Sequence, residues 1–215
     1  MSGAVPVFTP VNVLTGFLGS GKTTLLQRLL RSPRLRDTAV LINEFGEVGL
    51  DHHLLEPIDE TTVLLQSGCL CCTIRGDLSK TLRELHAKRD DGRVPAYRRV
   101  VIETTGLADP LPVLTTVTAD PVLRHHYRLG NVITTIDAVN GRDQLDRQHE
   151  SVKQAAVADR LVVTKADLAD SADVRSLIDR VRHLNPGAYI VIGSATEDQA
   201  ERLLTQDVFD VTAKT

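Results

Sequence analysis

Hydrophobic residues along the chain form short, nearly continuous runs that alternate with segments of helical periodicity. The runs at 100–102 and 161–163 are apolar and rich in valine, a composition typical of strands buried on both faces of a parallel sheet. Leu78, Leu82 and Leu85 repeat at offsets of four and three, which predicts a helix after residue 76. Strands are expected at 11–15, 38–42, 62–66, 99–103, 131–137, 160–164 and 188–192.

This alternation of strands and helices predicts the overall architecture. Strand, helix and strand at this spacing indicate an α/β fold with a doubly wound, mostly parallel sheet flanked by helices. In such a fold, ligands bind at the carboxyl ends of the strands. The chain has 215 residues, of which 42% are apolar, enough for one self-sufficient core. No stretch rich in Pro, Gly or Ser interrupts it, so residues 1–215 are expected to form a single domain.

Charge and apolar run length exclude two classes of partner. The 25 Lys and Arg residues are scattered among 28 Asp and Glu residues, giving a formal net charge of −3, whereas a nucleic-acid binder carries a basic stripe. No apolar run approaches the roughly 20 residues that cross a bilayer. The N-terminus lacks the basic head and apolar stretch of a secretion signal. We therefore expect a cytoplasmic protein with no nucleic-acid or membrane partner.

The most specific motif is GFLGSGKT at 16–23, which follows an apolar strand and opens a leucine-rich helix. It matches the phosphate-binding P-loop, in which glycines let consecutive backbone N–H groups point at phosphate oxygens. Lys22 is expected to reach the β- and γ-phosphates, and the Thr23 hydroxyl is expected to bind Mg²⁺. The nucleotide-binding residues expected here are Gly16, Gly19, Ser20, Gly21, Lys22, Thr23 and Thr24.

A P-loop also needs an acid for Mg²⁺ at the end of another strand. Glu103 ends the run VVIE and is expected to hold the hydrated ion together with Thr23. Three residues later, the backbone N–H of Gly106 is expected to contact the γ-phosphate. The acidic segment 44–60 is expected to be an irregular loop in the position of a switch. In it Glu44, Glu47 or Asp51 is the candidate organiser of the attacking water, with no choice among them.

A second motif addresses base recognition. In TKAD at 164–167, the Asp167 carboxylate can accept hydrogen bonds from N1–H and the exocyclic amine of guanine, which adenine lacks. The stem of Lys165 is expected to pack on the purine. Thr164 stands where GTPases more often carry Asn, which predicts a weaker bracing bond to the P-loop. Ser194 and Ala195 resemble the loop whose N–H meets guanine O6. The nucleotide is therefore predicted to be GTP.

The three cysteines are crowded into CLCC at 69–72, in a chain without a secretion signal. Such crowding indicates metal or thiol chemistry, and thiolates favour Zn²⁺ and related ions. Three adjacent thiols do not fill a tetrahedron easily, so a fourth ligand stays open between several donors. The alternatives are Glu44, Glu47, His52, His53, water or a client protein. The competing interpretation of Cys69, Cys71 and Cys72 is a small buried hydrophobe or a redox pair.

Taken together, these segments resemble the CobW-type metallochaperone GTPases, relatives of UreG and HypB. The segments that carry the resemblance are GFLGSGKTTLL, INEFGEVGLD (42–51), GCLCC (68–72), VVIETTGLADP (100–110), TTIDAVNG (134–141), ADRLVVTKADL (158–168) and VFDV (208–211). The resemblance implies a SIMIBI-like P-loop NTPase fold, slow GTP hydrolysis, and delivery of Zn²⁺ or Co²⁺ to a client metalloprotein. Family members usually continue into a smaller C-terminal domain, which this sequence does not contain.

Two other function classes remain open at this point. A P-loop kinase of a small metabolite would share the sheet and the phosphate loop, but TKAD would have no purpose in it. A metal-storage or thiol-redox module would explain the cysteines and leave the P-loop idle. The sequence also leaves open whether two copies of the chain pair.

Overall fold

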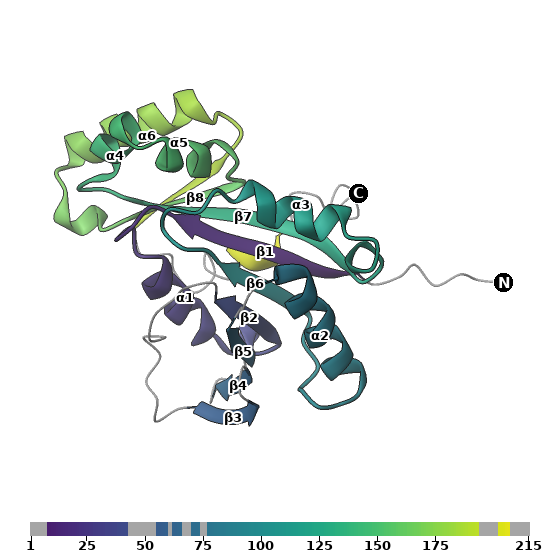
Figure 1. The fold of residues 1–215 in the computed structure, drawn as a ribbon. Helices are drawn as coiled ribbons and strands as arrows, with labels where there is room; N and C mark the ends of the chain where they lie inside the picture. Colours follow the sequence, from purple (N-terminus) through teal and green to yellow (C-terminus); the bar gives the residue numbers. More distant parts are fainter. Residues whose placement is uncertain are drawn as a thin grey trace, which may run out of the picture.

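The computed structural model describes residues 8–42, 55–59, 62–65, 70–73, 77–193 and 202–206. Its centre is a nine-stranded sheet with the order β3-β4-β5-β2-β6-β1-β7-β8-β9 (Figure 1). The strands are β1 (Thr9–Gly16), β2 (Thr38–Ile42), β3 (Leu55–Asp59), β4 (Thr62–Leu65), β5 (Leu70–Thr73), β6 (Arg99–Glu103), β7 (Tyr127–Asp137), β8 (Arg160–Thr164) and β9 (Tyr189–Ile192). The helices are α1 (Lys22–Leu30), α2 (Leu78–Asp90), α3 (Leu111–Ala119), α4 (Gly141–Arg147), α5 (His149–Ala156) and α6 (Ser171–Leu184), with 3-10 turns η1 (Pro33–Leu35), η3 (Leu123–His125) and η4 (Ala166–Leu168).

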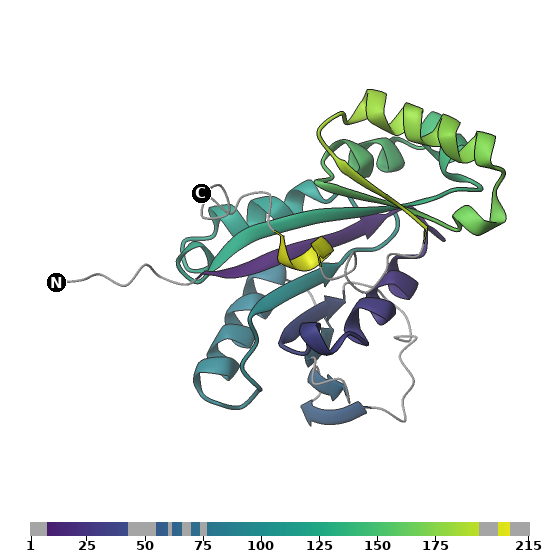
Figure 2. The ribbon, with the colours of Figure 1, turned by 180° about the vertical axis from the view of Figure 1, so that it is seen from behind.

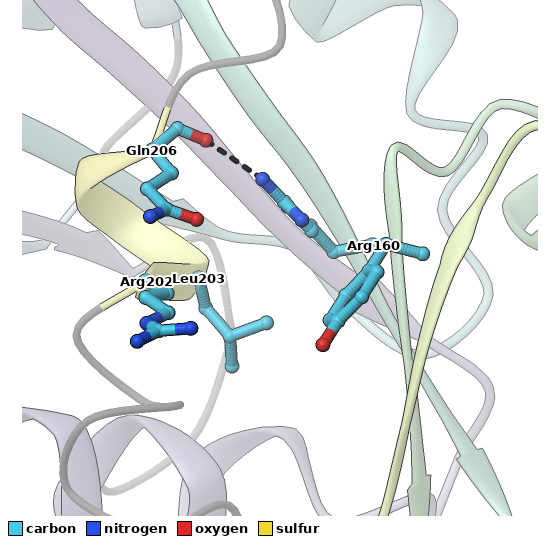
Figure 3. Close-up of a pocket in the computed structure, with 5 residues that line it drawn as sticks. Arg160, Arg202, Leu203 and Gln206 are labelled. Atoms are coloured by element: carbon cyan, nitrogen blue, oxygen red, sulfur yellow. Dashed lines mark hydrogen bonds between the residues drawn. The ribbon is translucent and has the colours of Figure 1, made fainter.

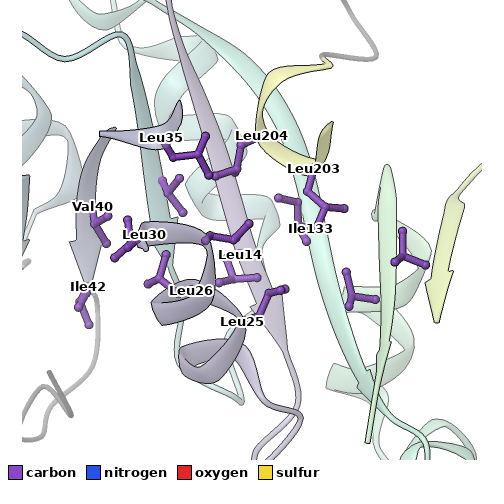
Figure 4. Packing of buried hydrophobic residues seen from close by; sticks show 14 residues of the cluster. Leu14, Leu25, Leu26, Leu30, Leu35, Val40, Ile42, Ile133, Leu203 and Leu204 are labelled. Carbon is purple, nitrogen blue, oxygen red and sulfur yellow. The ribbon is translucent and has the colours of Figure 1, made fainter. Parts of the chain in front are cut away.

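The strands from β5 to β9 in this order pair in parallel, which confirms the doubly wound α/β prediction. Alternate residues of one strand face opposite layers, as the two-residue period of a strand requires. Val101 of β6 packs in the cluster under α1, whereas Val100 and Ile102 pack under α2 and α3. Figure 4 shows the α1 leucines against Leu14 and against β2. A third cluster joins α4, α5 and α6 to β8.

One edge of the sheet departs from the prediction. Residues 55–59, expected inside an irregular loop, form β3, which pairs antiparallel with β4. Cys71 and Cys72, expected to follow the strand at 62–66, lie inside a separate strand, β5, which pairs antiparallel with β4. The reason is the connection between these two strands. It spans only residues 66–69, and a parallel crossover needs a dozen residues or more.

The other predicted strands agree closely with the structure. Those at 38–42, 99–103 and 160–164 have the expected bounds, while β7 begins four residues earlier than expected, at Tyr127. The segment after α2 contributes Val94 and Tyr97 to the core, both 5% exposed. Within the described part of the chain, no helix combines the length and apolar character that a membrane span requires.

Figure 2, the view from behind, shows α1 and the turn at 202–205 on the face opposite α2 and α3. Leu203 and Leu204 of that turn are each 1% exposed and pack with the α1 leucines. A turn near the end of the chain therefore completes the layer that carries the P-loop helix.

Candidate nucleotide site

The loop between β1 and α1 has the backbone shape that phosphate binding requires. Gly16 has φ +145°, and a Cβ there would lie 2.3 Å from Thr135 Oγ1 and 2.5 Å from the Thr135 carbonyl oxygen, so only glycine fits. Gly21, with φ 88°, is the left-handed N-cap of α1. The Ser20 hydroxyl lies 2.6 Å from the Thr135 hydroxyl. β7 therefore holds the loop while the α1 N-terminus is directed at its interior.

Lys22 is the first residue of α1, and its ammonium group is folded back over this loop. Nζ donates to the Gly16 carbonyl at 3.0 Å and to the Phe17 carbonyl at 3.3 Å, and the residue is 7% exposed. The loop thus presents a buried positive charge at the N-terminus of α1, an arrangement suited to a polyanionic ligand.

Thr23 and Glu103, expected to share Mg²⁺, are in direct contact. The Thr23 hydroxyl donates to Glu103 Oε1 at 2.7 Å, and Glu103, at the end of β6, is 2% exposed. Parallel pairing of β6 with β1 places Glu103 beside Leu14, just before the loop. A hydroxyl and a carboxylate are hard oxygen donors of the kind that Mg²⁺ prefers, so these residues fit that ion.

The segment after Glu103 lies against the P-loop. The Thr104 N–H donates to the Leu14 carbonyl at 3.0 Å, and its hydroxyl donates to Thr15 Oγ1 at 2.9 Å. A Cβ on Gly106 would lie 2.7 Å from the Leu18 nitrogen, so close an approach that glycine is required. Gly106 therefore lies against Leu18 of the loop, and its contact with the γ-phosphate stays a prediction.

TKAD begins at the end of β8 and reaches the P-loop through its first residue. The Thr164 hydroxyl donates to the Ser20 carbonyl at 2.7 Å. The short threonine side chain therefore makes a bracing bond from the end of the strand to the P-loop.

Lys165 joins the same region through an acid that the sequence analysis missed. Its Nζ donates to the Gly19 carbonyl at 2.8 Å and to Asp137 Oδ2 at 2.6 Å. Burial raises the pKa of Asp137, but hydrogen bonds from Lys165, Val139 N–H and the Asn140 amide outweigh it, and the net pKa lies below its usual range. The available signal was an acid at the end of the apolar run 131–137, the same signal that identified Glu103.

Removal of the Asp137 carboxylate tests this connection. Asp137→Ala is expected to lower GDP affinity about tenfold, because Lys165 loses the charged hydrogen bond that orients it. Isothermal titration with GDP measures the effect. Asp146→Ala, which removes an exposed acid of α4 paired with Arg180, is the matched control and should bind GDP like the unmodified chain. Equal GDP affinity in both variants would contradict a role for Asp137.

A cavity of about 280 Å³ opens between α1 and TKAD, close to the lower end of the roughly 300–1,000 Å³ usual for ligand pockets. Gly21 and Thr24 line one side, and Thr164, Lys165 and Asp167 line the other. The cavity is continuous with the P-loop through Gly21, so a nucleotide can place its phosphates in the loop and its base near Asp167.

A smaller cavity lies elsewhere in the molecule, at the amino ends of β8 and β9 (Figure 3). It has about 160 Å³ and is lined by Arg160, Tyr189, Arg202, Leu203 and Gln206. Arg160 Nη2 donates to the Gln206 carbonyl at 2.9 Å. Because the P-loop and TKAD lie at the carboxyl ends of the strands, this cavity is not part of the nucleotide site.

Several expected site residues fall outside the described residues. These are Glu44, Glu47, Asp51, His52, His53, Cys69, Ser194 and Ala195. Cys71 and Cys72 are described as backbone within β5, where they pair with Val40 and Leu41 of β2. Among the described residues, no three His, Cys, Asp or Glu side chains are grouped for a metal ion. The metal-ligand assignment therefore stays a prediction.

Comparison with known proteins agrees with this geometry. The Escherichia coli zinc chaperone YjiA is 38% identical over 178 residues, which cover 83% of this chain and 55% of that protein. The Schizosaccharomyces pombe zinc-regulated GTPase metalloprotein activator 1 is 35% identical over 189 residues, which cover 85% of this chain and 45% of that protein. The chain thus spans about half the length of these curated relatives.

The chain is also similar to solved structures of such GTPases. The crystal structure of Zn(II)-bound YjiA GTPase from E. coli aligns with a TM-score of 0.73 at 36% identity, covering 87% of this chain and 57% of that chain. HypB from Helicobacter pylori in complex with nickel aligns with a TM-score of 0.57 at 16% identity, covering 90% and 82%, and shows the fold alone. Residues 10–192 match the family model described as CobW/HypB/UreG, nucleotide-binding domain. The chain belongs to the CobW/HypB/UreG family.

Proposed function

We propose that this chain is a GTP-hydrolysing metallochaperone module, which binds a transition metal at its cysteine segment and releases it to a client in step with the nucleotide. The observation that carries the proposal is the buried contact of Thr23 with Glu103, because Glu103 also lies in the same cross-strand row as the end of the cysteine strand.

The phosphate end of the site supports hydrolysis. The Lys22 ammonium exchanges its loop carbonyls for β- and γ-phosphate oxygens and neutralises charge that develops there. Mg²⁺, when bound by Thr23 and Glu103, stabilises the charge on the phosphate oxygens. Glu44, Glu47 or Asp51 orients the attacking water, and the Gly106 N–H contacts the γ-phosphate.

The base end of the site favours guanine. Asp167 accepts from N1–H and the exocyclic amine, while the stem of Lys165 packs against the purine. Ser194 and Ala195 directly follow Gly193, which lines the cavity, and supply the contact to guanine O6. Thr164 and Lys165 both donate to P-loop carbonyls. Base recognition and phosphate binding are thereby parts of one connected site.

The position of the cysteine strand supports coupling to the nucleotide. Thr73, the residue after Cys72, pairs with Ile42 of β2, and Ile42 pairs with Glu103 of β6. Since neighbouring strands lie about 4.8 Å apart, the backbones of Thr73 and Glu103 are separated by about 10 Å. Only β2 therefore separates the strand that ends in Glu103 from the cysteine strand, so a rearrangement around the γ-phosphate can displace both.

The metal is proposed to be Zn²⁺ or Co²⁺, bound by Cys69, Cys71 and Cys72. Thiolates suit such ions, and two relatives carry zinc in their names. A further donor or a client metalloprotein completes the coordination. GTP, GDP and the metal ion are the proposed small partners.

The alternatives explain less of the geometry. A kinase of a small metabolite would need the P-loop but not the contacts that connect Asp137 and Lys165 to it. A storage or thiol-redox module would use the cysteines and leave the Thr23–Glu103 pair without purpose. Both accounts leave half of the site unexplained.

A competitive Zn²⁺ titration with Mg²⁺ and either GTP, GDP or no nucleotide tests the proposal. Metal affinity is expected to be about 5- to 150-fold higher with GTP than with GDP, and metal should raise GTP affinity by the same factor. The variant with Cys69, Cys71 and Cys72 all replaced by Ser should lose this coupling and retain its GTP affinity. Identical metal affinity in all three nucleotide states would refute metal delivery by this chain.

A further inference from the structure

Gln154 of α5 makes an unusual contact with the segment that follows Glu103. The residue is 0% exposed, and its amide nitrogen donates to the Gly106 carbonyl at 3.2 Å and to the Ala108 carbonyl at 3.0 Å. We propose that Gln154 is a positioning residue that sets Gly106 for contact with the γ-phosphate, and so lets the site distinguish GTP from GDP. This inference rests on the proposed function of the P-loop.

Both N–H groups of the Gln154 amide are used on this one segment, and its oxygen is not used at all. Oε1 is buried and has no hydrogen-bond partner among the described residues. A buried acceptor without a partner destabilises a fold, and an apolar side chain of equal length would avoid that loss. The amide therefore acts through its two donors, on the two carbonyls that they reach.

The other side of Gln154 is fixed to the strand beside the P-loop. Its backbone carbonyl accepts a 2.7 Å hydrogen bond from the Thr134 hydroxyl of β7, and Thr134 pairs with Thr15 at the end of β1. The amide thus spans from the strands that carry the P-loop to the segment that covers it. The buried Gln154 amide therefore positions Gly106 relative to Leu18 and does so without touching the nucleotide.

This geometry predicts that loss of the Gln154 contact lowers the affinity for GTP and leaves the affinity for GDP unchanged. The Gly106 carbonyl accepts from Gln154, so the peptide unit that follows Gly106 has a defined orientation, and this limits the positions open to the adjacent Gly106 N–H. GDP has no group at that position and makes no use of the contact. A residue that only supported the fold would alter the affinity of both nucleotides alike.

The preceding residue supplies a control on the same helix. Lys153 Nζ donates to Asp109 Oδ2 at 3.1 Å, with side chains 57% and 33% exposed. An exposed ion pair of this kind contributes little. Lys153→Met therefore removes a second contact between α5 and the same segment, and it keeps the buried hydrogen bonds of the Gln154 amide.

The experiment compares Gln154→Met, Gln154→Asn and Lys153→Met with the unmodified chain. Methionine keeps the side-chain length and removes both donors, whereas asparagine keeps an amide too short to reach both carbonyls. We expect both Gln154 variants to lower kcat for GTP hydrolysis about tenfold, and to lower the affinity ratio of a non-hydrolysable GTP analogue over GDP by a similar factor. GDP affinity should stay within about twofold, and Lys153→Met should change neither quantity.

Two results would overturn the inference. One is an unchanged affinity ratio and kcat in whichever Gln154 variant folds, as judged by its circular dichroism. The other is an equal loss of affinity for the analogue and GDP, which means that Gln154 only supports the fold. Failure of the proposed function has a different signature, because the unmodified chain would then not bind or hydrolyse GTP in the same assays.

Discussion

Lys22→Ala is expected to lower kcat for GTP hydrolysis by at least about 100-fold, the usual loss when one preorganised charge-stabilising group is removed. The Lys22 ammonium donates to the Gly16 and Phe17 carbonyls. It therefore lies over the loop and needs little reorganisation to reach the phosphates of a bound nucleotide. Phosphate release under single-turnover and steady-state conditions measures the loss, and triphosphate affinity should fall with it.

The fold should survive this substitution, because the Lys22 ammonium donates to carbonyls of the loop and the apolar cluster under α1 is built from other residues. Lys80→Ala is the matched control, since Lys80 of α2 is 76% exposed and pairs with the exposed Glu84. It should hydrolyse GTP at the unmodified rate. Turnover in Lys22→Ala within tenfold of the unmodified chain would mean that the P-loop is not the hydrolytic site.

The parts of the fold that the sequence predicts well are those where one local signal suffices. β2, β6 and β8 are buried runs whose apolar residues face both layers, so their bounds follow from hydrophobicity alone. Gly16, Gly19 and Gly21 of the P-loop all have positive φ, a backbone conformation that glycine adopts readily, so their spacing in the sequence predicts the turn. Glu103 is predicted from the sequence because a P-loop needs an acid for Mg²⁺ and Glu103 ends such a run.

The edge of the sheet could not be predicted in this way. β3 has the sequence LEPID, with two acids and a proline, which resembles a loop and is tolerated because β3 is an edge strand. The direction of β4 depends on the short connection between β4 and β5, and the periodicity of either strand carries no information about it. Cys71 and Cys72 nevertheless lie near the carboxyl edge, since β5 itself is parallel to β2.

Contacts between distant residues account for what the sequence missed in the site. Asp137 and Lys165 are 28 positions apart, and Gln154 is 48 positions from Gly106. A glutamine in the middle of a helix has no motif that marks it as buried or functional. Only the packing of α5 over the segment after Glu103 reveals which backbone carbonyls its amide can reach.

Guanine nucleotides are expected to bind at least about 100-fold more tightly than adenine nucleotides, because a carboxylate that loses its paired donors forfeits about 3 kcal/mol. Asp167 belongs to η4, where the Leu168 N–H closes the turn on the Lys165 carbonyl at 3.0 Å. Gly193 lines the same cavity, and its N–H donates to the Val163 carbonyl at 2.7 Å. Backbone hydrogen bonds therefore hold both segments beside the proposed base site, and competition titrations with GDP and ADP measure the selectivity.

Asp167→Asn should reverse the preference and not merely weaken it. Xanthine carries a carbonyl where guanine carries its exocyclic amine, and an asparagine N–H₂ can donate to that carbonyl while a carboxylate cannot. We expect GDP affinity to fall about 100-fold and XDP affinity to rise in the same variant. Asp143→Asn is the control, because Asp143 is an exposed acid of α4 paired with Arg147, and it should leave both affinities unchanged. Equal binding of ADP and GDP by the unmodified chain would refute the assignment of Asp167, whereas a loss of GDP affinity without a gain for XDP would show that Asp167 shapes the pocket without reading the base.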